Sequence, residues 1–136
     1  MQVLLDLADK WFDQTQVCFA LEQWADQLTQ RNLEEWLAPY KTEFIGGKTI
    51  ALVLAGNLPL VGFHDILSSL ISGHNILCKS SSKDPVLTKF ILEKLMRIEP
   101  RFKPFIQWTD GPLKNFDGVI ATGSNNSALH FEYYFK

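Results

Sequence analysis

Cysteine is scarce in this chain of 136 residues, which contains only Cys18 and Cys78. The two thiols lie far apart and belong to no CxxC motif, and the three histidines, His64, His74 and His130, are equally scattered. This spacing builds neither a zinc site nor another metal site. Because two isolated thiols are typical of a protein from a reducing compartment, we expect a cytoplasmic protein without a bound metal.

Long apolar runs and an excess of basic residues are also missing. No run reaches the roughly 18 apolar residues of a membrane-spanning helix, and the N-terminus lacks the cationic and apolar regions of a signal peptide. Lys and Arg number 13 against 15 Asp and Glu, which gives a formal charge of −2 and a pI of about 5.9. Such a chain has no surplus positive charge for phosphate backbones. We therefore expect neither a membrane nor a nucleic acid among its partners.

The first 45 residues form a segment with helical periodicity. Its apolar residues recur at spacings of three and four, as they do on one face of a helix. They include Val17, Leu21, Trp24, Ala25 and Leu28, followed by Leu33, Trp36 and Leu37. Pro39 discourages continuation of the helix, and Gly46-Gly47 marks a turn. We expect residues 1–45 to be helical, beginning with a short amphipathic helix over residues 1–7.

From residue 46 onward, apolar runs alternate with amphipathic segments. The run TIALVL at 49–54 has no polar alternation, which is typical of a strand buried on both faces of a parallel sheet. Further strands are predicted at 76–79, 105–108 and 118–121. Helices are predicted from Pro59 to about Ser72, from Pro85 to Pro100 with Asp84 as the N-cap, and from residue 126 onward.

This alternation predicts an α/β fold, a Rossmann-like doubly wound parallel sheet preceded by the N-terminal helical segment. In such sheets a ligand lies outside the carboxyl ends of the strands. Three small or polar segments occupy that position, namely Ala55-Gly56-Asn57, residues 79–82 and Thr122-Gly123-Ser124. Their coincidence is the main indication of function that the pattern alone provides.

Each segment offers a chemical role and a plainer alternative. The Asn57 amide could donate to an oxyanion, or Asn57 could cap the helix that follows. Lys79 and the serines at 80–82 could hold ribose hydroxyls or a phosphate, or Lys79 could be a solvated residue of a polar loop. Gly123 and Ser124 could seat a pyrophosphate on free backbone amides, or Ser124 could be a simple N-cap. The pattern leaves these alternatives open.

Two longer segments resemble the acyl-CoA reductase family, the fatty-acid reductase component of bacterial luminescence systems and its relatives, within the aldehyde dehydrogenase superfamily. They are TIALVLAGNLPLVGFHDILSSLISGHNILCKSSSKDP and DGVIATGSNNSALHFEYYF. The resemblance extends from Lys48 to Phe135, and the order and spacing of its motifs agree with the family. The first 45 residues fit it only loosely.

The resemblance implies roles for the strand-end residues. AGNLP resembles the superfamily motif PWNFP, which places Asn57 where an amide stabilises the oxyanion of the substrate. KSSSKDP resembles KPSExTP, so Lys79 takes the place of the lysine that binds the adenosine ribose. ATGS resembles FTGS, which assigns the cofactor pyrophosphate to Gly123 and Ser124. The flanking cofactor-binding positions are Ala55, Gly56, Ser81 and Ser82.

The implied reaction is the reduction of an acyl-CoA or another acyl thioester to an aldehyde, with NADPH or NADH, through a cysteine acyl-enzyme. Many NAD-specific relatives have a Glu where this chain has Ser82. An acid there would repel a 2′-phosphate, whereas Ser82 between Lys79 and Lys83 would tolerate one. This favours NADPH over NADH. The connection between Trp108 and Gly118 is also too short for the helix found there in ordinary aldehyde dehydrogenases.

The family's catalytic cysteine lies well downstream of the GS motif, in a separate catalytic domain. Neither Cys18 nor Cys78 matches its position. We therefore interpret residues 46–136 as part of an NAD(P)-binding domain, and the chain as an N-terminal piece of a longer reductase that is inactive alone. The alternative is a stand-alone dinucleotide-binding or interaction module without catalysis. A second copy of the same chain is a further candidate partner, in a homo-oligomer.

Overall fold

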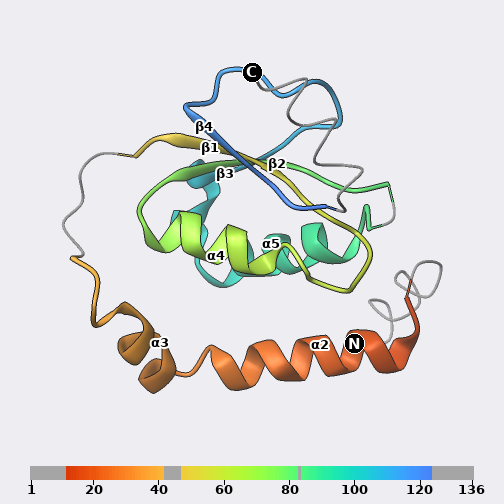
Figure 1. Cartoon of the computed structure of the whole chain (residues 1–136), viewed down its shortest axis with the longest axis vertical. Coiled ribbons are helices and arrows are strands. Elements are labelled where there is room, and N and C mark those ends of the chain that lie inside the picture. Colours follow the sequence, from red (N-terminus) through yellow and green to blue (C-terminus); the bar gives the residue numbers. More distant parts are fainter. Residues whose placement is uncertain (1–11, 42–46, 83, 124–136) are drawn as a thin grey trace.

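The computed structural model of the protein describes residues 12–41, 47–82 and 84–123. Two helices, one 3-10 helix and a four-stranded sheet follow a helical pair near the N-terminus (Figure 1). In chain order the elements are α2 (Gln14–Gln27), α3 (Gln30–Leu37), β1 (Thr49–Val53), α4 (Phe63–Ile71), β2 (Asn75–Lys79), α5 (Leu87–Ile98), η1 (Pro100–Phe105), β3 (Ile106–Trp108) and β4 (Gly118–Ala121). The helices expected over 1–7 and from 126 lie outside the described residues.

The sheet confirms the predicted parallel α/β architecture. Its order is β3-β2-β1-β4, and all three pairings are parallel. The chain builds the sheet in one direction from β1 to β3 and then returns to place β4 on the free side of β1. The order of the strands therefore reverses between β1 and β4, which is the topological switch point at which ligands bind in open α/β sheets.

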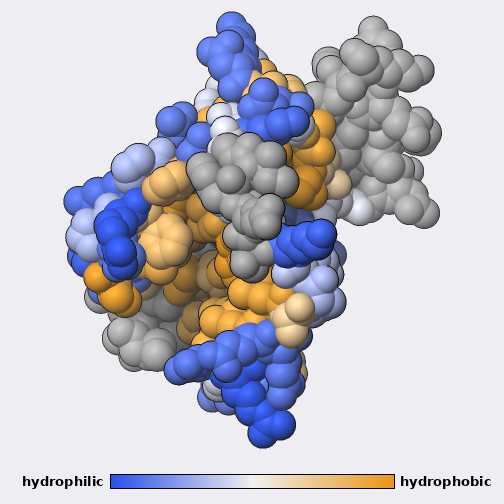
Figure 2. Space-filling model, turned by 90° about the vertical axis from the view of Figure 1, so that its left-hand side faces the viewer, coloured by the Kyte–Doolittle hydropathy of each residue, from blue (hydrophilic) through white to orange (hydrophobic). Residues whose placement is uncertain are grey.

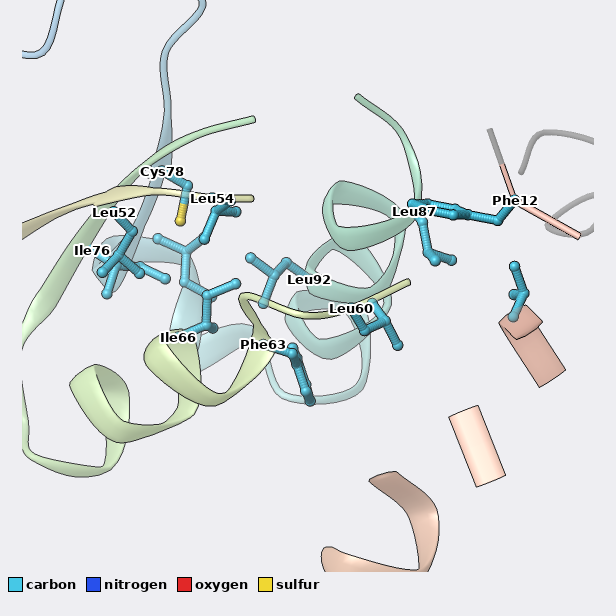
Figure 3. Packing of buried hydrophobic residues seen from close by; sticks show 12 residues of the cluster. Phe12, Leu52, Leu54, Leu60, Phe63, Ile66, Ile76, Cys78, Leu87 and Leu92 are labelled. Carbon is cyan, nitrogen blue, oxygen red and sulfur yellow. The ribbon is translucent and has the colours of Figure 1, made fainter. Parts of the chain in front are cut away.

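The core lies between the sheet and the helices α4 and α5. Because side chains alternate along a strand, Leu52 and its register partner Cys78 point to the same face. Figure 3 shows both pointing toward Ile66 of α4 and Leu92 of α5. All four side chains are completely buried. Burial of each of the Leu and Ile side chains contributes about 1.5–3 kcal/mol, so the packing of α4 and α5 on this face stabilises the fold.

The helices α2 and α3 form the predicted helical segment below α4 (Figure 1). The Asp13 carboxylate caps α2 by accepting a hydrogen bond of 2.9 Å from the amide of Thr15. Trp24 of α2 packs edge-to-face on Phe63 of α4, with the ring centroids 5.0 Å apart. Val17 is fully buried. The segment is therefore anchored to the α/β unit by its apolar face.

The expected start of the helix at Pro59 is wrong, because α4 begins only at Phe63. Leu60 has a φ of 56° and only 2% of its side chain is exposed. A left-handed residue cannot continue a right-handed helix, so the helix can begin only after Leu60, whose side chain is buried. Short hydrogen-bonded turns, such as the one from Phe63 N to Leu60 O at 3.0 Å, fill the connection instead.

The expected helix start at Pro85 is also wrong by two residues, because α5 begins at Leu87. Val86 has φ −120° and ψ −49°, which lies outside the helical region. The predicted N-cap is wrong too, because the N-cap residue is Val86. Asp84 still contacts the start of the helix, since its carboxylate accepts a hydrogen bond of 2.9 Å from the amide of Leu87. The connection between β3 and β4, residues 109–117, contains no helix, as we expected from its short length.

None of the helices in the described ranges has the length and apolarity to cross a membrane.

We predict that Cys78 resists alkylation while the protein is folded. Burial raises the pKa of its thiol from 9.0 to about 12, which lowers the thiolate fraction at pH 8 about a thousandfold. Iodoacetamide labelling followed by mass spectrometry should modify the half-buried Cys18 and spare Cys78 until urea is added. Equal labelling of the two thiols in the native protein would contradict the burial.

The same shift in pKa predicts how stability depends on pH. The folded-state pKa of Cys78 lies above its unfolded value of 9.0. The free energy of unfolding should therefore be unaffected by this group below about pH 9 and should fall as the pH rises toward 12. Urea denaturation of the wild type and of Cys78→Val at pH 8 and pH 10.5 measures the difference. A pH dependence that is the same in both proteins would exclude Cys78 as its source.

Candidate functional site

The three sequence segments that we singled out meet at the carboxyl edge of the sheet. Val53, the last residue of β1, is in register with Lys79 of β2 and with Ala121 of β4. The loops that follow these strands therefore leave the sheet side by side (Figure 1). Among the described residues, the first loop carries Asn57, the second carries residues 80–82 and Asp84, and the third carries Thr122-Gly123.

Thr122 joins the ends of β1 and β4 at the switch point. Its amide donates to the carbonyl of Val53 at 3.1 Å, and its hydroxyl donates to the same carbonyl at 3.3 Å. The hydroxyl oxygen also accepts a hydrogen bond of 3.3 Å from the amide of Ala55. Thr122 therefore holds Ala55, near the start of the Asn57 loop, next to the end of β4. Ala55 itself is half-buried.

Gly56 brings the Asn57 loop into contact with the loop after β2. A Cβ atom at this position would lie 2.5 Å from Ser81 Oγ and 3.0 Å from the amide nitrogen of Asp84. Both distances are shorter than ordinary van der Waals contacts, so only glycine fits between the two loops. Ser81 is half-buried at this contact, and Ser82 next to it is exposed.

Lys79 is tied to the connection between β3 and β4. Its ammonium group donates a hydrogen bond of 3.0 Å to the carbonyl of Gly111. Because Lys79 alternates with the fully buried Cys78, its side chain lies on the sheet face opposite α4 and α5. The alternative of a freely solvated lysine is therefore wrong. An ammonium has three donors, so two N–H groups remain for a ligand at the carboxyl edge.

Asn57 is exposed and does not cap the helix that follows. The N-cap of α4 is Gly62, which makes no side-chain cap bond, and Asn57 precedes it by five residues. The capping alternative is therefore wrong, because the turns around Leu60 separate the two positions. Gly123 is exposed at the end of β4, whereas Ser124 lies outside the described residues.

Sequence reasoning missed two partners of the site. The ATGS motif predicts roles for Gly123 and Ser124 only. Its threonine, Thr122, makes the hydrogen bonds to Val53 of β1 and to Ala55. The sequence also does not indicate that the carbonyl of Gly111 accepts a hydrogen bond from Lys79, because 32 residues separate the two. Within 12–41, 47–82 and 84–123, no group of three His, Cys, Asp or Glu side chains could hold a metal ion.

A separate groove lies between α2, α3 and α4, away from the strand ends. Its volume is about 510 Å³. The aromatic and aliphatic side chains that line it include Trp24, Leu28, Leu33, Trp36 and Leu67. His64 also lines it and packs against Trp36, with the ring centroids 5.7 Å apart. Figure 2 shows hydrophobic surface gathered in a hollow on the side of the molecule where α3 lies.

The fold and the strand-end site define an α/β protein with a parallel sheet and a switch point at which small and polar residues gather. The sequence matches the family model of acyl-CoA reductase (LuxC) over residues 20–130. The chain belongs to this family, because the match covers most of its length. No curated protein and no solved structure gives a significant match to the chain.

We predict that Thr122→Val destabilises the protein by about 1–3 kcal/mol, because it leaves the amide of Ala55 without its acceptor. Urea denaturation followed by circular dichroism measures this change. Thr49→Val, at the amino end of β1, serves as the matched control and should cost less. If the two variants lose the same stability, the Thr122 hydroxyl does not fasten the loop.

Proposed function

We propose that this chain is the N-terminal, cofactor-binding part of an acyl-CoA reductase that uses NADPH to convert an acyl thioester into an aldehyde. The observation that carries the proposal is the convergence of Asn57, Lys79 and Thr122-Gly123 at one edge of the sheet. It occurs in a chain that belongs to the acyl-CoA reductase family. Residues 46–136 would form part of the nucleotide-binding domain.

The residues present suit a dinucleotide. Lys79 keeps two N–H donors after its bond to Gly111, and these can serve ribose hydroxyls. Ser81 and Ser82 lie on the loop that follows Lys79. Gly56, which has no side chain, lets the Asn57 loop pack closely against that loop. The exposed Gly123, with Ser124 after it, would face the pyrophosphate. When bound, NADPH would supply the hydride for the reduction.

Asn57 would hold the substrate carbonyl. Its side chain is exposed at the switch-point edge, where its NH₂ group can donate to the thioester oxygen. A donor placed there stabilises the oxyanion that develops during acyl transfer, and removal of one such donor typically costs about 10²–10³ in rate. Coenzyme A would be the leaving group when a cysteine attacks the thioester.

The cysteine nucleophile of this reaction is assigned to a residue that is not among these 136. Cys78 is fully buried in the core, and the raised pKa of its thiol leaves it without thiolate at neutral pH. Cys18 lies on α2, in the helical segment rather than at the strand ends. We therefore expect the chain alone to bind the dinucleotide without reducing acyl-CoA.

The first test is the affinity of the purified chain for NADPH. Lys79→Met should weaken binding about tenfold or more, because hydrogen bonds to a charged group contribute about 1.5–3 kcal/mol. Isothermal titration calorimetry measures both dissociation constants. Lys114→Met, which removes an exposed lysine from the β3–β4 connection, is the matched control and should bind like the wild type. Equal affinities for the wild type and Lys79→Met would overturn the assignment of Lys79.

The choice of cofactor gives a second test. Ser82→Glu adds a negative charge beside Lys79 and should lower the affinity for NADPH more than the affinity for NADH, because the acid repels the 2′-phosphate. Ser82→Gln has nearly the same size without the charge, and it should affect both cofactors alike. If Ser82→Glu weakens the two cofactors equally, Ser82 does not lie at the ribose.

A further inference from the structure

The Asn57 loop lies against the turn that is closed by the hydrogen bond between Ser81 and Asp84, and Gly56 makes the contact. A Cβ on Gly56 would approach Ser81 Oγ to 2.5 Å, Ser81 Cβ to 2.7 Å and the amide nitrogen of Asp84 to 3.0 Å. Real Cβ contacts essentially never fall below 3.0 Å. The two loops are therefore closely packed at Gly56, and Asn57 is the next residue after this contact.

Asp84 holds the turn to the start of α5 by hydrogen bonds. Only 6% of Asp84 is exposed. Its carboxylate accepts hydrogen bonds of 2.9 Å from the amide of Leu87 and 3.1 Å from the hydroxyl of Thr88, both in the first turn of α5. Its own amide donates to the carbonyl of Ser81 at 3.2 Å. The turn is thus fastened to α5 on one side and packed against Gly56 on the other.

We propose that Gly56 and Asp84 are positioning residues that couple the placement of Asn57 to the loop formed by residues 79–82. The inference rests on the proposed function, in which that loop holds the nucleotide and Asn57 holds the substrate carbonyl. A nucleotide seated on Lys79 and Ser82 fixes the turn, and the turn then fixes the Asn57 loop through Gly56. Asp84 acts only through the turn and touches neither ligand.

The first experiment adds a methyl group at the contact. Gly56→Ala should weaken NADPH binding by the purified chain about tenfold, because the turn must move away from its place beside Lys79. Ser81→Gly in the same chain removes Ser81 Oγ and Cβ, the two nearest of the three atoms that the methyl would meet, and it should restore part of the lost affinity. A direct contact between Gly56 and the nucleotide would not be relieved in this way, so an unrelieved loss would overturn the coupling.

Gly62→Ala is the matched control in the same connection. Its new Cβ would lie 2.7 Å from Cδ2 of Leu54, the far end of a flexible side chain, and not beside Ser81. This variant should lower the free energy of unfolding and change the dissociation constant for NADPH by less than about twofold. If Gly56→Ala folds and binds NADPH like the wild type, the coupling is wrong.

The second experiment needs no ligand. Asp84→Ala releases the turn from α5, and hydrogen exchange measured by mass spectrometry should then accelerate in the peptide that contains residues 55–62, on the other loop. Asp84→Asn keeps an oxygen that can accept from the Leu87 amide and should preserve the slow exchange. If Asp84→Ala changes exchange only in α5, Asp84 stabilises only the start of that helix and the coupling is wrong.

The two experiments separate this inference from the proposed function. A wild-type chain that binds no dinucleotide overturns the proposed function, while the exchange measurement still decides whether the loops are coupled. A wild-type chain that binds NADPH through Lys79, with exchange at 55–62 unaffected by Asp84→Ala, overturns the coupling and keeps the function. If Gly56→Ala does not fold, the double variant with Ser81→Gly and the Asp84 pair give the answer.

Discussion

The structure depends on β1 lying in the middle of a parallel sheet. It pairs with β2 on one side and β4 on the other, and Ala51 and Leu52, on its opposite faces, are both completely buried. These pairings place Lys79 and Ala121 level with the end of β1. A slip of one residue between β1 and β2 would turn Lys79 toward the core and expose Cys78. The composition of the site therefore follows from the register of one five-residue strand.

The architecture could be predicted from the sequence because burial on both faces leaves a visible pattern. The run TIALVL has no polar alternation, and it becomes the central strand. The predicted strand at 118–121 agrees with β4 residue for residue. The first residues of the helices were harder to predict. Proline is common at the first position of a helix, but this local preference does not determine where α4 begins. Burial of Leu60 in a left-handed conformation overrides it.

The site could be predicted as a set of positions but not as a set of contacts. Parallel topology brings the loops after β1, β2 and β4 to one edge, which is why Asn57, Lys79 and Gly123 could be chosen in advance. The hydrogen bond from Lys79 to Gly111 and the fit of Gly56 against Ser81 depend on how separate loops pack. No spacing within the sequence contains that information. The family match supports the function that these positions suggested.

The pairing of β4 with β1 also determines when the strand-end site can be complete. The hydrogen bond between Thr122 and Val53 joins residues 69 positions apart, and contacts of such long range form late because a large loop must close first. During synthesis, β1, α4, β2 and α5 leave the ribosome before β4 does. A nascent chain can therefore assemble the core and the loops around Asn57 and Ser81 while their third neighbour is still being made. The carboxyl edge at the switch point is then complete only when β4 has joined the sheet.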